Sequence, residues 1–266
     1  RVESRGRRGA PVKTVLHHFN VLACRNVDTS VFRLRQNEHK QPIQKNFVNL
    51  DCTGALYDMR GKPLWFLPDS DRAKTGLFHF RDLELTNKGT LTLLQGDRAT
   101  EVDYNGKLLW EAPYEGRQGG QHVLNYHHEV NRLSNGHYMV MGSEIARWAI
   151  PMEKTGTDKG AVEKGASGPA RPQRINFGTV LEFDKDGKEV WAWHSADYFR
   201  QTEMFQHLLP DGQLACRDPH ENAFYFDEDA RVVYVGFRDL CYILKVKYPE
   251  GNVLEVFDGH ESPGKN

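Results

Sequence analysis

The chain has 266 residues, of which 39% are hydrophobic, so one large domain or two small ones with a sizeable core are possible. Its 35 basic and 36 acidic side chains nearly cancel, which argues against nucleic acid as the main partner. No run of apolar residues reaches the roughly 18 that a membrane-spanning helix needs. The four cysteines form no CxxC or other metal-binding spacing, and they leave the redox compartment open.

The chain begins with a basic segment that lacks the apolar core of a signal peptide. We predict that residues 1–13 form a disordered basic arm and that residues 14–266 form one β-domain. Because the chain starts with Arg1 rather than Met, a processed N-terminus is plausible, and the missing signal says little about location.

Two short motifs recur along the chain and predict β-hairpins. The first has a strand that ends in Asp, a turn with Gly, and a strand that ends in Trp: Asp58-Met-Arg-Gly61-Lys-Pro-Leu-Trp65, Asp103-Tyr-Asn-Gly106-Lys-Leu-Leu-Trp110 and Asp184-Lys-Asp-Gly187-Lys-Glu-Val-Trp191. The second motif has Asn-Gly or Asp-Gly turns in two of its copies: Leu85-Thr-Asn-Lys-Gly89, Leu133-Ser-Asn-Gly136 and Leu209-Pro-Asp-Gly212. Two hairpins in series make a four-stranded antiparallel meander, which is the blade of a β-propeller.

The predicted fold class is therefore all-β, a β-propeller with about four blades visible in this chain. In chain order the blades are expected at residues 14–67, 78–111, 123–193 and 216–258. The third is interrupted near 150–175 by a Gly-, Lys-, Glu- and Pro-rich insertion, which is typical of a surface loop. The segment from Ser195 to Phe205 is moderately helical in pattern, and the tryptophans of the first motif are expected to pack between blades. Since no strand near the C-terminus returns to the first blade, we expect the propeller to be incomplete at that end.

The last blade contains the most informative stretch, from Asp218 to Arg238. Phe224 and Phe226, then Val233 and Val235, alternate on either side of an acidic turn, which predicts a hairpin. His220 precedes its first strand and Arg238 follows its second, so the two side chains are expected at one end of the hairpin. A guanidinium beside an imidazole suits an oxyanion such as phosphate, sulfate or carboxylate.

The third blade repeats part of this pattern at His127-His128-Glu129. Each of the two blades opens with His, an acidic residue and a nearby Asn, and first strands line the central channel of a propeller. We therefore predict that His128 and His220 face one site with Arg238. A histidine at this position can also serve only to hydrogen-bond the next blade, and a histidine cluster could bind zinc, although no third ligand with metal-like spacing is present.

The ordered set of these motifs resembles the bacterial arylsulfate sulfotransferases. The similarity covers most of residues 46–258 and rests on the Asp-x-x-Gly-Lys-x-x-Trp repeats, Tyr126-His-His-Glu-Val-Asn-Arg-Leu-Ser-Asn-Gly136, and His220-Glu-Asn-Ala followed 18 residues later by Arg238. The resemblance implies a six-bladed propeller, a periplasmic homodimer, and transfer of a sulfuryl group from an aryl sulfate to a phenol without the nucleotide donor PAPS or another cofactor. By this likeness His128, His220 and Arg238 are catalytic residues in the channel, with His127 and Asn222 in substrate binding and no metal.

The chemistry of the reaction agrees with these residue types. An arginine can bind two sulfate oxygens, a histidine can stabilise or protonate the departing phenolate, and a neutral imidazole can accept the sulfuryl group as sulfohistidine. In the family this last histidine lies in a later blade, and His260 stands in a different context, so the nucleophile is not assigned here and a longer protein is expected. The alternatives are a non-catalytic propeller that binds proteins or glycans, and a metal-dependent sulfatase- or lactonase-like hydrolase.

Overall fold

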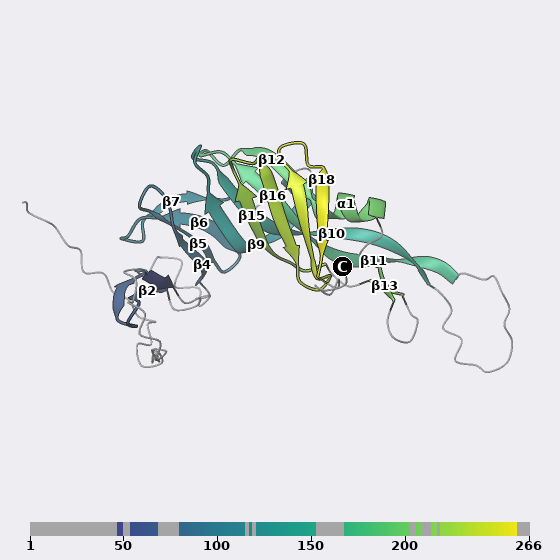
Figure 1. Cartoon of the computed structure of the whole chain (residues 1–266), viewed down its shortest axis with the longest axis horizontal. Coiled ribbons are helices and arrows are strands. Elements are labelled where there is room, and N and C mark those ends of the chain that lie inside the picture. Colours follow the sequence, from purple (N-terminus) through teal and green to yellow (C-terminus); the bar gives the residue numbers. More distant parts are fainter. Residues whose placement is uncertain are drawn as a thin grey trace, which may run out of the picture.

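The computed structural model describes residues 47–49, 54–68, 80–114, 117–118, 121–152, 168–202, 206–208, 214–216 and 219–259. The basic arm predicted at 1–13 and the strands expected between 14 and 46 lie outside these residues. The described part is mostly β, built from antiparallel sheets (Figure 1). None of its helices is long and apolar enough to cross a membrane.

Four sheets and a short hairpin follow one another along the chain. The first sheet has β1 (Phe47–Asn49), β2 (Ala55–Asp58) and β3 (Pro63–Phe66). The second has β4 (Phe80–Leu85), β5 (Leu91–Gln95), β6 (Arg98–Val102) and β7 (Leu108–Glu111). The third has five strands in the order β12-β11-β10-β9-β8: β8 (Arg117–Gln118), β9 (Gln121–Arg132), β10 (Tyr138–Met152), β11 (Gly168–Phe183) and β12 (Glu189–His194).

The fourth sheet is joined to the third through a helix and a hairpin. Helix α1 (Ser195–Thr202) lies within the segment predicted to be helical, and β13 (Gln206–Leu208) pairs with β14 (Leu214–Cys216). The fourth sheet has β15 (Glu221–Asp227), β16 (Val232–Phe237), β17 (Tyr242–Lys247) and β18 (Val253–Asp258). The predicted hairpin from His220 to Arg238 is confirmed, because the Arg238 backbone N donates to the His220 carbonyl at 2.9 Å.

Both ends of the insertion predicted near 150–175 are β-strands, and residues 153–167 lie outside the described residues. Strands β10 and β11 stay paired beyond its predicted borders, with Ile150 opposite Arg171 and Met152 opposite Gly168 (Figure 1). The polar and glycine-rich composition concealed this extension, because an antiparallel ladder is held by backbone hydrogen bonds whatever the side chains are.

The repeated Asp-Gly turns have one hydrogen-bond pattern in three sheets. In each, the Asp Oδ1 accepts two backbone N–H groups of the turn, at 2.8 to 2.9 Å, from the second and fourth residues after Asp58, Asp103 and Asp184. The glycine at the third position adopts a positive φ of 75 to 80°, which explains why the motif needs glycine. The first sequence motif therefore encodes a self-contained turn.

Adjacent sheets pack face to face through apolar clusters. Leu94, Ala99 and Trp110 of the second sheet meet Tyr138 and Phe183 of the third, among other residues. The opposite face of the third sheet, with side chains such as Met139, Met141 and Val180, packs against Phe224, Val233 and Leu244 of the fourth. Each strand supplies both faces because its side chains alternate, and this is how one sheet can lie between two others.

The tryptophans of the repeat lie at these junctions, as predicted. The Trp65 indole N–H donates to the Tyr104 carbonyl at 2.9 Å, and the Trp191 indole N–H donates to the Pro249 carbonyl at 2.7 Å. Trp110 instead stacks on Tyr138 with ring centroids 3.7 Å apart.

Strands β4 and β15, which begin the second and fourth sheets, both contact β9, the first long strand of the third sheet. Two carboxylates connect them: Asp82 accepts from the Val130 backbone N at 2.8 Å, and Glu129 accepts from the Phe224 backbone N at 2.6 Å. This arrangement is consistent with neighbouring propeller blades. No sheet among the described residues closes a ring.

A buried ion pair between the second and third sheets provides a test of this packing. Glu101 is 0% exposed and binds Arg132 Nη1 at 2.6 Å, and it also accepts from the Thr90 and Tyr138 hydroxyls. We expect Glu101→Gln to lower the free energy of unfolding by about 3 kcal/mol, because the largely buried Arg132 loses its counter-ion. Urea unfolding measures the change.

Glu111 is the matched control, since it pairs with Arg98 at 2.7 Å in the same sheet but nearer to solvent. Its replacement by Gln should cost less than about 1 kcal/mol. Equal losses in the two variants would contradict a special contribution of the buried junction.

Candidate functional site

Histidines from two sheets meet at one cavity of about 330 Å³. Its walls come from β9, β10, β11 and the residues at the start of β15. The residues that line it are Asn125, His127, His128, Ser143, Asn176, His220 and Glu221. The convergence of His128 and His220, inferred from repeat register, is thus observed in the structure.

The backbone at both histidines explains how they reach the cavity. His128 has a φ of 63° and His220 a φ of 57°, a left-handed conformation that is uncommon for residues other than glycine. His128 lies where the pairing of β9 with β10 shifts register between Val140 and Gly142. A bulge of this kind redirects a side chain from the sheet face, and strained positions of this kind are concentrated at functional sites.

The imidazoles are close enough to share one small ligand. The ring centroids of His128 and His220 are 6.2 Å apart, and those of His127 and His128 are 5.0 Å apart with the planes nearly perpendicular. An anion with several oxygens can accept hydrogen bonds from donors at this separation.

Arg238 approaches the cavity from behind His220 and is not among the residues that line it. Its Nη2 lies 3.0 Å from His220 Nδ1, and its Nε donates to Asp239 Oδ1 at 2.9 Å. Because a guanidinium only donates, Nδ1 of His220 must be the acceptor, which leaves the ring proton on Nε2. Arg238 thereby fixes the tautomer of His220, and its side chain is 60% exposed.

The local field around the histidines is positive. Burial, together with the nearby His220, Arg81 and Arg238, lowers the pKa of His128. Arg81 lies on β4 of the second sheet and was not a candidate from the sequence. Arg81 lies outside the repeated motifs, so the sequence carried no signal for it.

His127 is held in the neutral state. Burial lowers its pKa to about 4, the charges of His128 and His220 add to this, and a hydrogen bond to the Gly142 backbone opposes it. The Nδ1 atom of His127 is buried and has no hydrogen-bond partner among the described residues. A neutral imidazole with an unpaired nitrogen can accept a hydrogen bond or a proton.

Two acidic residues, each directly after a histidine, behave differently. Glu129 connects β9 to β15 as described, and burial raises its pKa to about 7 although the Phe224 N–H opposes the shift. Glu221 reaches the cavity wall itself. Asn222, predicted to bind substrate, is exposed and is not among the residues that line the cavity. Within the described part of the chain, no group of three His, Cys, Asp or Glu residues is arranged to hold a metal ion.

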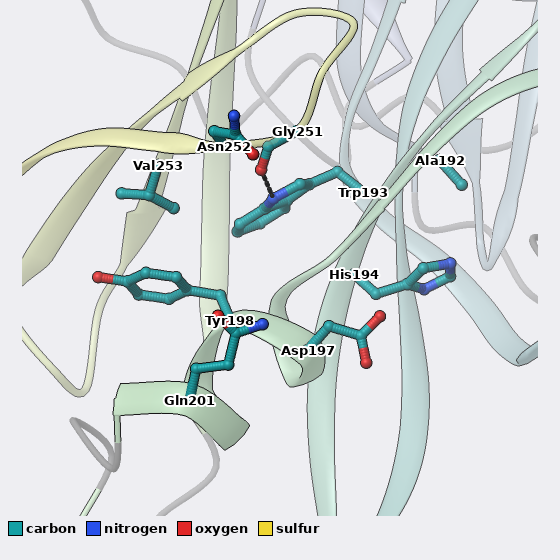
Figure 2. Close-up of a pocket in the computed structure, with 9 residues that line it drawn as sticks. All are labelled: Ala192, Trp193, His194, Asp197, Tyr198, Gln201, Gly251, Asn252 and Val253. Atoms are coloured by element: carbon teal, nitrogen blue, oxygen red, sulfur yellow. Dashed lines mark hydrogen bonds between the residues drawn. The ribbon is translucent and has the colours of Figure 1, made fainter.

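A second cavity of about 430 Å³ lies between β12, α1 and the turn before β18 (Figure 2). The Trp193 indole N–H donates to the Gly251 carbonyl there at 3.1 Å. His194 and Asp197 lie on the opposite side from Val253, and the Asp197 carboxylate is directed toward His194 (Figure 2). None of the residues predicted to be functional lines this cavity.

The fold and the site define a mostly-β protein of antiparallel sheets with a histidine-lined cavity between the third and fourth sheets. No protein-family model and no curated protein matches the chain. A crystal structure of a protein of unknown function from Bacteroides caccae is similar over 79% of this chain and 70% of its own, with 11% sequence identity and a TM-score of 0.35. This likeness is too weak to carry an argument about function.

The neutral state of His127 makes the stability of the folded protein depend on pH. Because its pKa in the folded protein, about 4, lies below the ordinary 6.5, the unfolded chain binds the proton more strongly. The contribution of His127 to stability is thus full above pH 6.5 and is lost as the pH falls from 6.5 toward 4. We expect NMR of the imidazole carbons to show His127 neutral at pH 5.5, and a titration near pH 6.5 would contradict the assignment.

Proposed function

We propose that this protein is an arylsulfate sulfotransferase, which moves a sulfuryl group from an aryl sulfate ester to a phenolic acceptor. The observation that carries the proposal is the meeting of His128 and His220, 6.2 Å apart, from separate sheets, with Arg238 hydrogen-bonded to His220. The sequence resemblance to arylsulfate sulfotransferases assigns the same three residues to sulfate binding.

The site suits the charge of such a donor. An aryl sulfate is a monoanion, and breaking its S–O bond to the ring places negative charge on the phenolate oxygen. His220 can donate its Nε2–H to an anionic oxygen, and the positive field of Arg81 and Arg238 favours the bound anion and the developing charge. The phenolate leaves with the electron pair of that bond, and the sulfuryl group passes to the accepting nitrogen.

The role of Arg238 differs from the one proposed from sequence alone. A guanidinium that directly grips two sulfate oxygens would line the cavity, whereas Arg238 binds Nδ1 of His220 and the Asp239 carboxylate. In this geometry it positions His220 and supplies charge. The histidine that accepts the sulfuryl group as sulfohistidine is not assigned to a residue of this chain.

Three further parts of the proposal come from the resemblance. They are closure of the blades into a six-bladed propeller, a periplasmic location and a homodimeric state. The contacts of β9 with β4 and β15 support the propeller.

Replacement of the cavity histidines tests the reaction. In the protein that includes the accepting histidine, we expect His128→Gln and His220→Gln each to lower kcat/KM for 4-nitrophenyl sulfate with a phenol acceptor by about 100-fold or more, because a positioned donor at the reacting oxygens is lost. The release of 4-nitrophenolate measures the rate.

The matched control is His137→Gln, since His137 pairs with Glu182 near the start of β10 and does not line the cavity. It should retain the rate of the unaltered protein. Absence of nitrophenolate release with every phenol acceptor would refute the transferase and favour a non-catalytic propeller that binds protein or glycan partners.

A further inference from the structure

Glu221 is built into the wall of the histidine cavity. It is 5% exposed, and its Oε1 accepts from the Ser195 hydroxyl at 2.7 Å. Ser195 itself is fully buried at the start of α1. The hydrogen bond therefore fixes the carboxyl group at one place in the wall.

Gly178 on β11 gives further support for a built site. A Cβ at this position would overlap the Cβ, Cγ and Cδ atoms of Glu221. The φ of Gly178 is not positive, so glycine is needed here for space and not for backbone conformation. Strand β11 therefore has space at Gly178 for the side chain of Glu221.

Ionisable groups surround Glu221 on several elements. On β10, Glu144 is buried and binds His194 Nδ1 at 2.7 Å. The other titratable or charged groups on these elements are His127, His128 and Glu129 on β9, His194 at the end of β12, Asp197 on α1, and His220, Arg238 and Asp239 at the open end of the hairpin. The carboxylate of Glu144 is thus partly compensated by His194, and Glu221 has no such cationic partner of its own among the hydrogen bonds of the described residues.

These surroundings make Glu221 able to change charge near neutral pH. Burial raises its pKa to about 7, hydrogen bonds from Ser195 and the Gly178 backbone oppose the shift, and the charge of Glu144 adds to it. Near pH 7 the carboxyl group therefore exchanges a proton with solvent at little cost.

We propose that Glu221 is a proton switch for the histidine cavity, which accepts an oxyanion when Glu221 is neutral and disfavours it when Glu221 is ionised. This inference rests on the proposed function, because it assumes that the cavity binds a sulfate group. A sulfate and a carboxylate that share 330 Å³ repel each other, so the anion binds together with one proton taken from solvent onto Glu221. No covalent bond other than this O–H changes.

Binding of inorganic sulfate at several pH values tests the switch. For the unaltered chain, isothermal titration should show affinity falling about tenfold per pH unit above the pKa of Glu221, because one proton is linked to binding. Glu221→Gln keeps the shape and an oxygen that can accept from Ser195. We expect its affinity to lose this alkaline dependence, with any remaining change due to the histidines.

The outcomes separate this inference from the proposed function. If sulfate binds and Glu221→Gln keeps the same pH profile, the switch is refuted and the anion site stands. If sulfate binds to neither protein at any pH, the anion site and the switch both fall. Infrared difference spectra give a direct readout, since sulfate should produce a protonated-carboxyl band that is missing in Glu221→Gln.

A second variant keeps the test valid if Glu221→Gln folds poorly. Glu144→Gln removes the negative charge that raises the pKa of Glu221, so the midpoint of the sulfate-binding profile should move to lower pH. An unchanged or higher midpoint would overturn the proposal. Thermal unfolding of each variant shows whether the fold is retained.

Discussion

The structure depends on carboxylates that reach from a strand of one sheet to the backbone of the next. Asp82 accepts from Val130, and Glu129 accepts from Phe224, so β4, β9 and β15 are held side by side. A charged acceptor on a backbone N–H is among the stronger hydrogen bonds in proteins. Because Glu129 directly follows His128, the bond that joins the sheets also fixes the backbone that presents this histidine.

The same constraint explains why the cavity occurs at these strands. The side chains of a β-strand normally alternate between the two faces of its sheet. None of them points along the edge of the sheet toward a neighbouring sheet. The positive φ of His128 breaks this alternation within β9, and the positive φ of His220 redirects the backbone just before β15. The imidazoles therefore point between the sheets, where the apolar clusters of the sheet junctions are interrupted by polar side chains.

Most of the fold could be predicted from the sequence, because each turn depends on residues that are close together in the chain. The turn at Asp103-Tyr-Asn-Gly106 needs only its own residues: Asp103 accepts two backbone N–H groups, and Gly106 supplies the positive φ. The extension of β10 and β11 could not be predicted in this way, since Ile150-Pro-Met152 and Gly168-Pro-Ala-Arg-Pro-Gln-Arg174 show no alternation of apolar and polar residues.

The site was only partly predictable, for a physical reason of a different kind. The register of the repeats predicted that His128 and His220 belong to one site, because equivalent positions of successive sheets converge. It did not indicate that Arg238 would bind His220 instead of lining the cavity, or that Arg81 would contribute charge from the preceding sheet. These facts depend on side-chain direction across sheet junctions, and a repeat pattern gives strand register without giving rotamers.

Several features of the cavity oppose stability, and this supports a functional role for it. His127 has a buried nitrogen without a hydrogen-bond partner in the part of the chain that the structure describes, two histidines occupy a left-handed backbone, and Glu221 is a buried carboxyl whose pKa is raised by desolvation. A junction selected only for packing would replace such groups with apolar side chains, as Phe224 and Val235 illustrate nearby in the same sheet. Unfavourable local choices grouped around one cavity are the pattern expected where binding or chemistry sets the sequence.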